Sequence, residues 1–112
     1  MKSFVLLASL VLATFPAFSE TQEAGIATLQ ELGRLNGQAL ACSEMAFSKK
    51  AKALMILHAP KTRRYGEIFE EATNASFLNQ GSTPDSCPTP DDFNARLSDL
   101  SHHLQTSLPA AQ

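Results

Sequence analysis

The chain has 112 residues, a formal net charge of −2 and 44% hydrophobic residues. A charge balance this close to neutral argues against nucleic acid as the main partner, because surfaces that bind nucleic acid are rich in lysine and arginine. The length predicts one domain, and a domain of this size buries a modest core that often needs a covalent staple.

The first 19 residues have the pattern of a secretory signal peptide. Lys2 supplies a positive charge, residues 4–13 are an apolar run, and Pro16 precedes small residues that predict cleavage after Ser19. The apolar run is shorter than the roughly 20 residues of a membrane-spanning helix, although an uncleaved anchor is the alternative. We therefore expect an exported protein, periplasmic or secreted, with a single mature domain over residues 20–112.

Only two cysteines are present, Cys42 and Cys87, and both follow the predicted leader. In an exported chain we expect them to form one intramolecular disulfide. A metal-bound thiol pair and an intermolecular bridge are the alternatives. An intramolecular bond closes a loop of about 46 residues, which the chain-entropy model values at about 4 kcal/mol of stability.

The mature chain begins with a predicted one-sided helix over residues 22–35. Asn36-Gly37 predicts the end of this helix, because both residues tolerate the left-handed conformation that terminates helices. In the alternative, the helix continues, and Gly33 and Gly37 form a notch for close packing. The apolar positions recur at three-residue steps, as expected for a helix that buries one side: Ile26, Leu29, Leu32 and Leu35.

The next predicted helix covers residues 38–58, and we expect it at the centre of the fold. Pro60 predicts its end, because the residue before a proline is displaced from helical geometry. Cys42 would tie this helix to the loop that carries Cys87. Its predicted buried side consists of Leu40, Cys42, Ala46, Phe47, Ala53, Leu54 and Leu57, widened by Met45, Met55 and Ile56.

A third helix is predicted over residues 61–79, followed by a proline-rich loop over residues 82–90. Asn79, Gln80 and Gly81 predict the helix end, because asparagine and glycine are common just past a helix terminus. Its predicted inner face consists of Tyr65, Ile68, Phe69, Ala72, Ala75 and Leu78, with Phe77 alongside.

The last predicted helix covers residues 90–108. Thr89 is a residue type that is preferred at the N-cap, and Pro90 suits the first helical position, where its missing N–H group costs nothing. One stripe of this helix is apolar and consists of Phe93, Leu97, Leu100, Leu104 and Leu108. No stretch alternates as a strand does, so the sequence predicts an all-α bundle of four helices, or three if the first two merge.

A cluster of six bases within sixteen residues is the strongest candidate for a binding surface. If the second and third helices fold back at Pro60, these bases lie at one end of the molecule and form a surface for an acidic partner. Alternatively, they are solvated charges paired with Glu44, Glu67 and Glu71. The cluster consists of Lys49, Lys50, Lys52, Lys61, Arg63 and Arg64.

The three histidines, His58, His102 and His103, are weak candidates for metal ligands, with Met45 and Met55 as soft partners for copper. Adjacent histidines on a helix point about 100° apart, which makes a shared ion unfavourable. The chain lacks a CxxC, HExxH or GxSxG motif and a glycine-rich phosphate loop. We therefore expect neither a cofactor nor catalysis.

The layout resembles that of small periplasmic helical proteins with one disulfide. The features that carry this resemblance are a short leader, the segment Ala41-Cys42-Ser43, and a second cysteine in the segment Cys87 to Phe93, before an amphipathic last helix. The HdeA/HdeB acid-stress chaperones and the Rap1a/Tai-type immunity proteins have this arrangement. The resemblance covers the mature chain as an arrangement only, and it implies a binding protein of the bacterial periplasm.

The sequence thus predicts a small exported protein that binds another protein through its basic face and has no catalytic activity. A small-ligand or metal carrier and an acid-stress chaperone are the alternative functions. We expect no contact with nucleic acid, and contact with a membrane only through an uncleaved leader.

Overall fold

The computed structural model describes residues 17–108, with side chains from residue 22 onward, and this part of the chain contains no strand. The predicted all-α class is therefore confirmed. Of the predicted leader, residues 1–16 lie outside the described range. The elements are α1 (Ala17–Ala41), α2 (Met45–His58), α3 (Arg63–Gly81), the short 3-10 helix η1 (Pro84–Ser86) and α4 (Pro90–Ser107).

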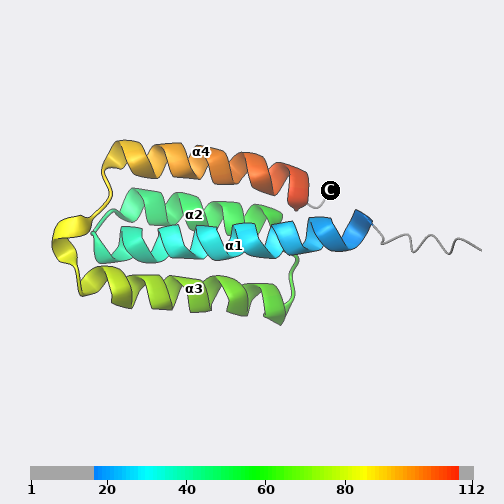
Figure 1. Cartoon of the computed structure of the whole chain (residues 1–112), viewed down its shortest axis with the longest axis horizontal. Helices are drawn as coiled ribbons and strands as arrows, with labels where there is room; N and C mark the ends of the chain where they lie inside the picture. The colour runs from blue at the N-terminus through cyan, green and yellow to red at the C-terminus, as the bar shows by residue number, and fades with distance from the viewer. Residues whose placement is uncertain (1–16, 109–112) are drawn as a thin grey trace, which may run out of the picture.

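Helix α1 is the centre of the bundle, because it contacts each of the other three α-helices (Figure 1). Helix α3 packs on one side of α1, while α2 and α4 pack on the other side and also contact each other. The chain runs in the same direction along α1 and α3 and in the opposite direction along α2 and α4. We predicted residues 38–58 as the central helix, and that prediction was wrong.

Helix α1 continues through Asn36-Gly37, so the predicted helix end at this position was wrong and the alternative, a continuous helix with a glycine notch, is confirmed. A Cβ atom added at Gly33 would lie 2.6 Å from the Phe69 carbonyl oxygen of α3. One added at Gly37 would lie 2.7 Å from the Phe77 amide nitrogen and closer still to the Thr73 carbonyl oxygen. Only glycine therefore allows the backbones of α1 and α3 to approach this closely.

The chain instead turns between Cys42 and Glu44. Ser43 has a φ of 60°, in the left-handed region, and it is the only residue other than glycine with positive φ in the described part of the chain. The Glu44 amide donates a 2.8 Å hydrogen bond to the Ala39 carbonyl oxygen and closes the turn. The second helix therefore begins at Met45, seven residues later than predicted.

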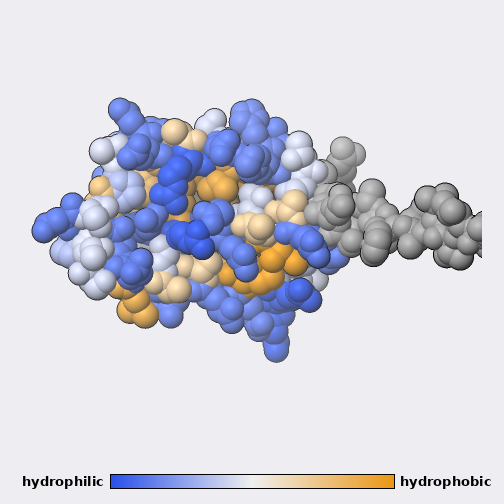
Figure 2. Space-filling model, viewed as in Figure 1, coloured by the Kyte–Doolittle hydropathy of each residue, from blue (hydrophilic) through white to orange (hydrophobic). Residues whose placement is uncertain are grey.

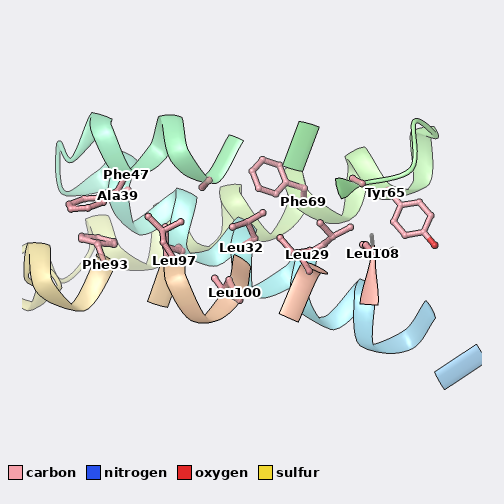
Figure 3. Close-up of a cluster of buried hydrophobic side chains, with 14 residues drawn as sticks. Leu29, Leu32, Ala39, Phe47, Tyr65, Phe69, Phe93, Leu97, Leu100 and Leu108 are labelled. Atoms are coloured by element: carbon pink, nitrogen blue, oxygen red, sulfur yellow. The ribbon is translucent and has the colours of Figure 1, made fainter. Parts of the chain in front are cut away.

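The core lies along the faces of α1 that meet the other helices (Figure 3). Every residue of the predicted stripe on α4 is buried, so that prediction is confirmed. The Thr89 cap is also confirmed, because its hydroxyl oxygen accepts a 3.2 Å hydrogen bond from the Asp92 amide. The rings of Phe47 and Phe93 stack with their centroids 5.0 Å apart and join α2 to α4.

The predicted inner faces of the second and third helices were only partly right. The main contacts of α3 are with α1, and those of α2 are with α1 and α4, so each buries a narrow stripe. Of the predicted residues, Phe47, Tyr65 and Phe69 are buried. Those that are exposed instead are Met45, Ala46, Ala53, Ile56, Leu57, Ala75, Phe77 and Leu78.

The predicted disulfide between Cys42 and Cys87 is present, with Cα atoms 5.9 Å apart. It joins the turn after α1 to the loop before α4. A chain of polar contacts supports the same end of the bundle: Arg96 donates to the Gln38 amide oxygen at 2.6 Å, and Gln80 donates to the Thr83 carbonyl oxygen at 3.1 Å. Burial lowers the pKa of the Arg96 guanidinium, and the neighbouring carboxylate of Glu31 opposes this shift.

Candidate functional site

A groove of about 610 Å³ lies between α2 and α3, with α1 as its floor. Both helices pack on α1, and the groove is the space that remains between them. Leu40 and Asn36 of α1 lie at the floor, Met55 and Ile56 line the α2 wall, and Phe77 lines the α3 wall. We call this feature the α2–α3 groove. Figure 2 shows one face of the molecule, on which apolar residues form patches among polar ones.

A buried polar network fixes the two walls of the α2–α3 groove on the floor helix. Asn36 is 1% exposed. Its amide oxygen accepts a 2.6 Å hydrogen bond from the Ser48 hydroxyl of α2, and its amide nitrogen donates to the Thr73 hydroxyl of α3 at 3.2 Å. Burial of these polar groups requires such pairing. One side chain of α1 therefore sets the position of α2 relative to α3.

Replacing Asn36 with Ala is expected to lower the free energy of unfolding by about 2 kcal/mol. The change leaves the buried Ser48 hydroxyl without its acceptor, which costs about 1–3 kcal/mol, and the higher helix propensity of Ala offsets only part of this loss. Urea denaturation followed by circular dichroism measures the difference. The matched control is Asn94→Ala, at an exposed position of α4, for which a change below about 0.5 kcal/mol is expected. Equal effects of the two changes would contradict a structural role for Asn36.

This network was not predicted from the sequence, because the Asn36-Gly37 pair indicates a helix end. Within a continuous helix, Asn36 falls on the same stripe as Leu29, Leu32 and Ala39, which are fully buried. A polar residue on an apolar stripe is the signal that identifies a buried hydrogen-bonding position.

All six bases of the predicted binding surface are exposed. Among the described residues, no carboxylate lies within 4 Å of any of them, so the alternative of pairing with Glu44, Glu67 and Glu71 is not realised. The six do not share one end of the molecule. Lys49, Lys50 and Lys52 lie along α2, and the other three lie at its junction with α3.

The bases of α2 also point in different directions around the helix. Lys52 lines the α2–α3 groove. Lys50 lines a second hollow, of about 420 Å³, between α2 and α4, and its ammonium group lies 5.6 Å from the centre of the Phe47 ring. The remaining bases, Lys61, Arg63 and Arg64, follow one another at the α2–α3 turn and form what we call the junction cluster.

The structure does not bring the three histidines together. His58 is buried, and its Nδ1 atom lies 2.6 Å from the Leu108 carbonyl oxygen, where it links the ends of α2 and α4. His102 and His103 are exposed on α4. Within the described residues, no group of three or more histidine, cysteine or acidic side chains is placed to hold a metal ion.

No protein family, curated protein or solved structure matches this chain. None of the helices within residues 17–108 combines the length and the apolar composition needed to cross a membrane.

Proposed function

We propose that the protein is an exported, non-catalytic binding protein that engages an acidic partner protein through the junction cluster. The observation that carries this proposal is three exposed bases within four residues, with no carboxylate within 4 Å among the described residues. Arg63 and Arg64 also occupy the first turn of α3, where the helix dipole disfavours positive charge by some tenths of a kcal/mol. A carboxylate on a partner would relieve both features.

Export is supported by the leader pattern and by the disulfide. An intramolecular disulfide is compatible with an oxidising extracellular compartment, and such bonds are rare in the reducing cytosol. The absence of recognised catalytic motifs from the sequence and the layout shared with small periplasmic binding proteins support binding over catalysis.

The test is a triple neutralisation, Lys61→Gln with Arg63→Gln and Arg64→Gln. A partner is captured from the extracytoplasmic fraction of the source cells with the wild-type protein, purified, and titrated against both proteins by calorimetry. Because exposed charge pairs contribute about 0.5 kcal/mol each, we expect Kd to rise about tenfold. We also expect wild-type binding to weaken as salt is added.

The control is Asn94→Glu with His102→Glu and Gln105→Glu, on the exposed side of α4. This variant changes the net charge by the same three units as the neutralisation, so a general charge effect would weaken both variants equally. A captured partner that binds the neutralised protein as tightly as the wild type would overturn the role of the junction cluster.

A further inference from the structure

The α2–α3 groove has walls of opposite charge, and the proposed function does not use it. Helix α2 carries no acidic residue, and of its three lysines Lys52 lines this groove, whereas Lys50 lines the hollow between α2 and α4. Beyond its first turn, α3 carries Glu67, Glu70 and Glu71 and no basic residue. Lys52 and Glu70 line the groove from opposite walls. A surface with one positive and one negative wall is complementary to a rotated copy of itself.

The heights of the residues along the groove follow from the Asn36 network. Ser48 and Thr73 both bind Asn36, so they lie at the same level of the two antiparallel walls (Figure 1). Lys52 is four residues from Ser48 towards the α2–α3 turn, and Glu70 is three residues from Thr73 in the same direction. With a rise of about 1.5 Å per residue, these two charges are level to within one residue.

Three exposed apolar side chains are matched in height across the groove in the same way. In the direction away from the turn, Met45 is three residues from Ser48 and Phe77 is four residues from Thr73, so they are level as well. Towards the turn, Ile56 is level with Gly66, where a Cβ atom would meet nothing within 4 Å. Lys52, Met45 and Ile56 of α2 are thus level with Glu70, Phe77 and the open space at Gly66 of α3, respectively.

We propose that the α2–α3 groove binds a second copy of this chain about a two-fold axis parallel to the groove. Such an axis keeps the height of every residue and places α2 of one copy against α3 of the other. Lys52 then meets Glu70 of the second copy, Met45 meets Phe77, and Ile56 meets the open space at Gly66. Because the contact is isologous, each pairing occurs twice.

The apolar exposure of the free chain supports this assignment. Ile56 is 68% exposed and Phe77 43%, and both line the groove that the second copy covers. Met45 is 48% exposed and lies on α2 at the level of Phe77. Large side chains on one contiguous surface with a polar rim are typical of protein interfaces. Three of the five large hydrophobic residues that are exposed in the described part of the chain and the Lys52–Glu70 pair therefore have one common explanation, whereas Leu57 and Leu78 do not line the groove.

The dimer goes beyond the proposed function and does not depend on it. Its contacts use Lys52 and Glu70, whereas the proposed function uses the junction cluster. The two-fold axis places the junction clusters of both copies at the same end of the dimer. A partner with two acidic segments would then be bound at two points, which raises its apparent affinity without a new contact.

The test is sedimentation equilibrium of the full mature chain, from about 1 µM to 1 mM, the range of weak specific association. We expect a monomer–dimer equilibrium for the wild type. Lys52→Glu and Glu70→Lys each place like charges opposite each other twice per dimer, and each should raise the dimer Kd at least about tenfold. The double variant restores opposite charges at both pairs, so its Kd should return to within about threefold of the wild type.

Two further variants complete the test. Lys50→Glu makes the same charge change on the other side of α2, and it should leave the dimer Kd unchanged. Ile56→Asp should abolish the dimer while leaving the circular dichroism spectrum helical, because the side chain is exposed in the single copy. All of these positions are at the surface, so the variants are expected to fold.

Three results would overturn the proposal. The first is a wild type that is monomeric at every concentration. In that case, binding of the apolar dye anilinonaphthalene sulfonate that is lost in Ile56→Asp would assign the groove to a different occupant. The second is a dimer that is insensitive to Lys52→Glu, which would place the contact on another face. The third is a double variant that remains as weak as the single variants, which would show that Lys52 and Glu70 do not face each other.

Discussion

A variant with both cysteines replaced, Cys42→Ser with Cys87→Ser, is expected to lose about 4 kcal/mol of its free energy of unfolding. The two residues are 45 positions apart, and the chain-entropy model gives this value for a loop of that length. Small domains have roughly 5–15 kcal/mol of net stability in total. The bond therefore supplies a large fraction of the stability, and the midpoint of urea denaturation should fall by more than about 2 M.

The disulfide contributes this much stability because it joins two segments that have few other contacts. The turn at Ser43 and the loop before α4 are otherwise connected by the stack of Phe47 on Phe93 and by the contacts of Gln38 and Gln80. In the variant, α4 should separate from the bundle first, which near-ultraviolet circular dichroism of the stacked phenylalanines would detect. Wild type under reducing conditions serves as the comparison and should match the variant, whereas the variant itself should not respond to the reductant. A loss below about 1 kcal/mol would mean that the polar contacts alone hold this end together.

The elements determined by neighbouring residues were predictable from the sequence. In α4, the cap, the proline and the apolar stripe all lie within one helix, and the stripe has a single phase. The disulfide was predictable because two cysteines in one chain allow one intramolecular pairing. Neither inference required knowledge of which helices are neighbours.

The features that were predicted wrongly depend on contacts between helices. Asn36-Gly37 has the local chemistry of a helix end, but Gly37 is required for contact with α3 and Asn36 for hydrogen bonds to α2 and α3. The turn occurs at Ser43 instead, a residue type that does not indicate a left-handed conformation. This turn lies between Cys42, which forms the disulfide, and Phe47, which stacks on Phe93.

The face of α2 was unpredictable for a different reason. Apolar residues surround much of this helix, so its periodicity does not select one side. The buried side includes Ser48 and His58, whose polar atoms are paired with Asn36 and with the Leu108 carbonyl oxygen. Ile56 is left exposed on the wall of the α2–α3 groove, and Leu57 is left exposed at the hollow between α2 and α4. The α2–α3 groove therefore became visible only when the neighbours of α2 were known, whereas the bases of the junction cluster belong to the surface predicted from the sequence.

The close approach of α1 to α3 at Gly37 gives the second large prediction. Replacing Gly37 with Ala is expected to lower the free energy of unfolding by at least about 2 kcal/mol, although Ala favours a helix over Gly by about 1 kcal/mol. The added Cβ atom would meet the backbone of α3 at Thr73 and Phe77, and a backbone cannot rotate away as a side chain can. Thermal denaturation should show a decrease in Tm of about 8–16 °C for a domain of this size.

Gly66→Ala is the matched control, because it makes the same change inside α3 at a position where a Cβ atom meets nothing within 4 Å. It should raise the stability by about 0.5–1 kcal/mol, so the same substitution should have opposite signs at the two sites. A stabilising effect at Gly37 would mean that α1 and α3 are not in contact there. Gly33 lies one turn away on the same face, so Gly33→Ala is also expected to destabilise. Once α3 has been displaced by one Cβ atom, the second costs less, and the double variant should lose less than the sum of the two single effects.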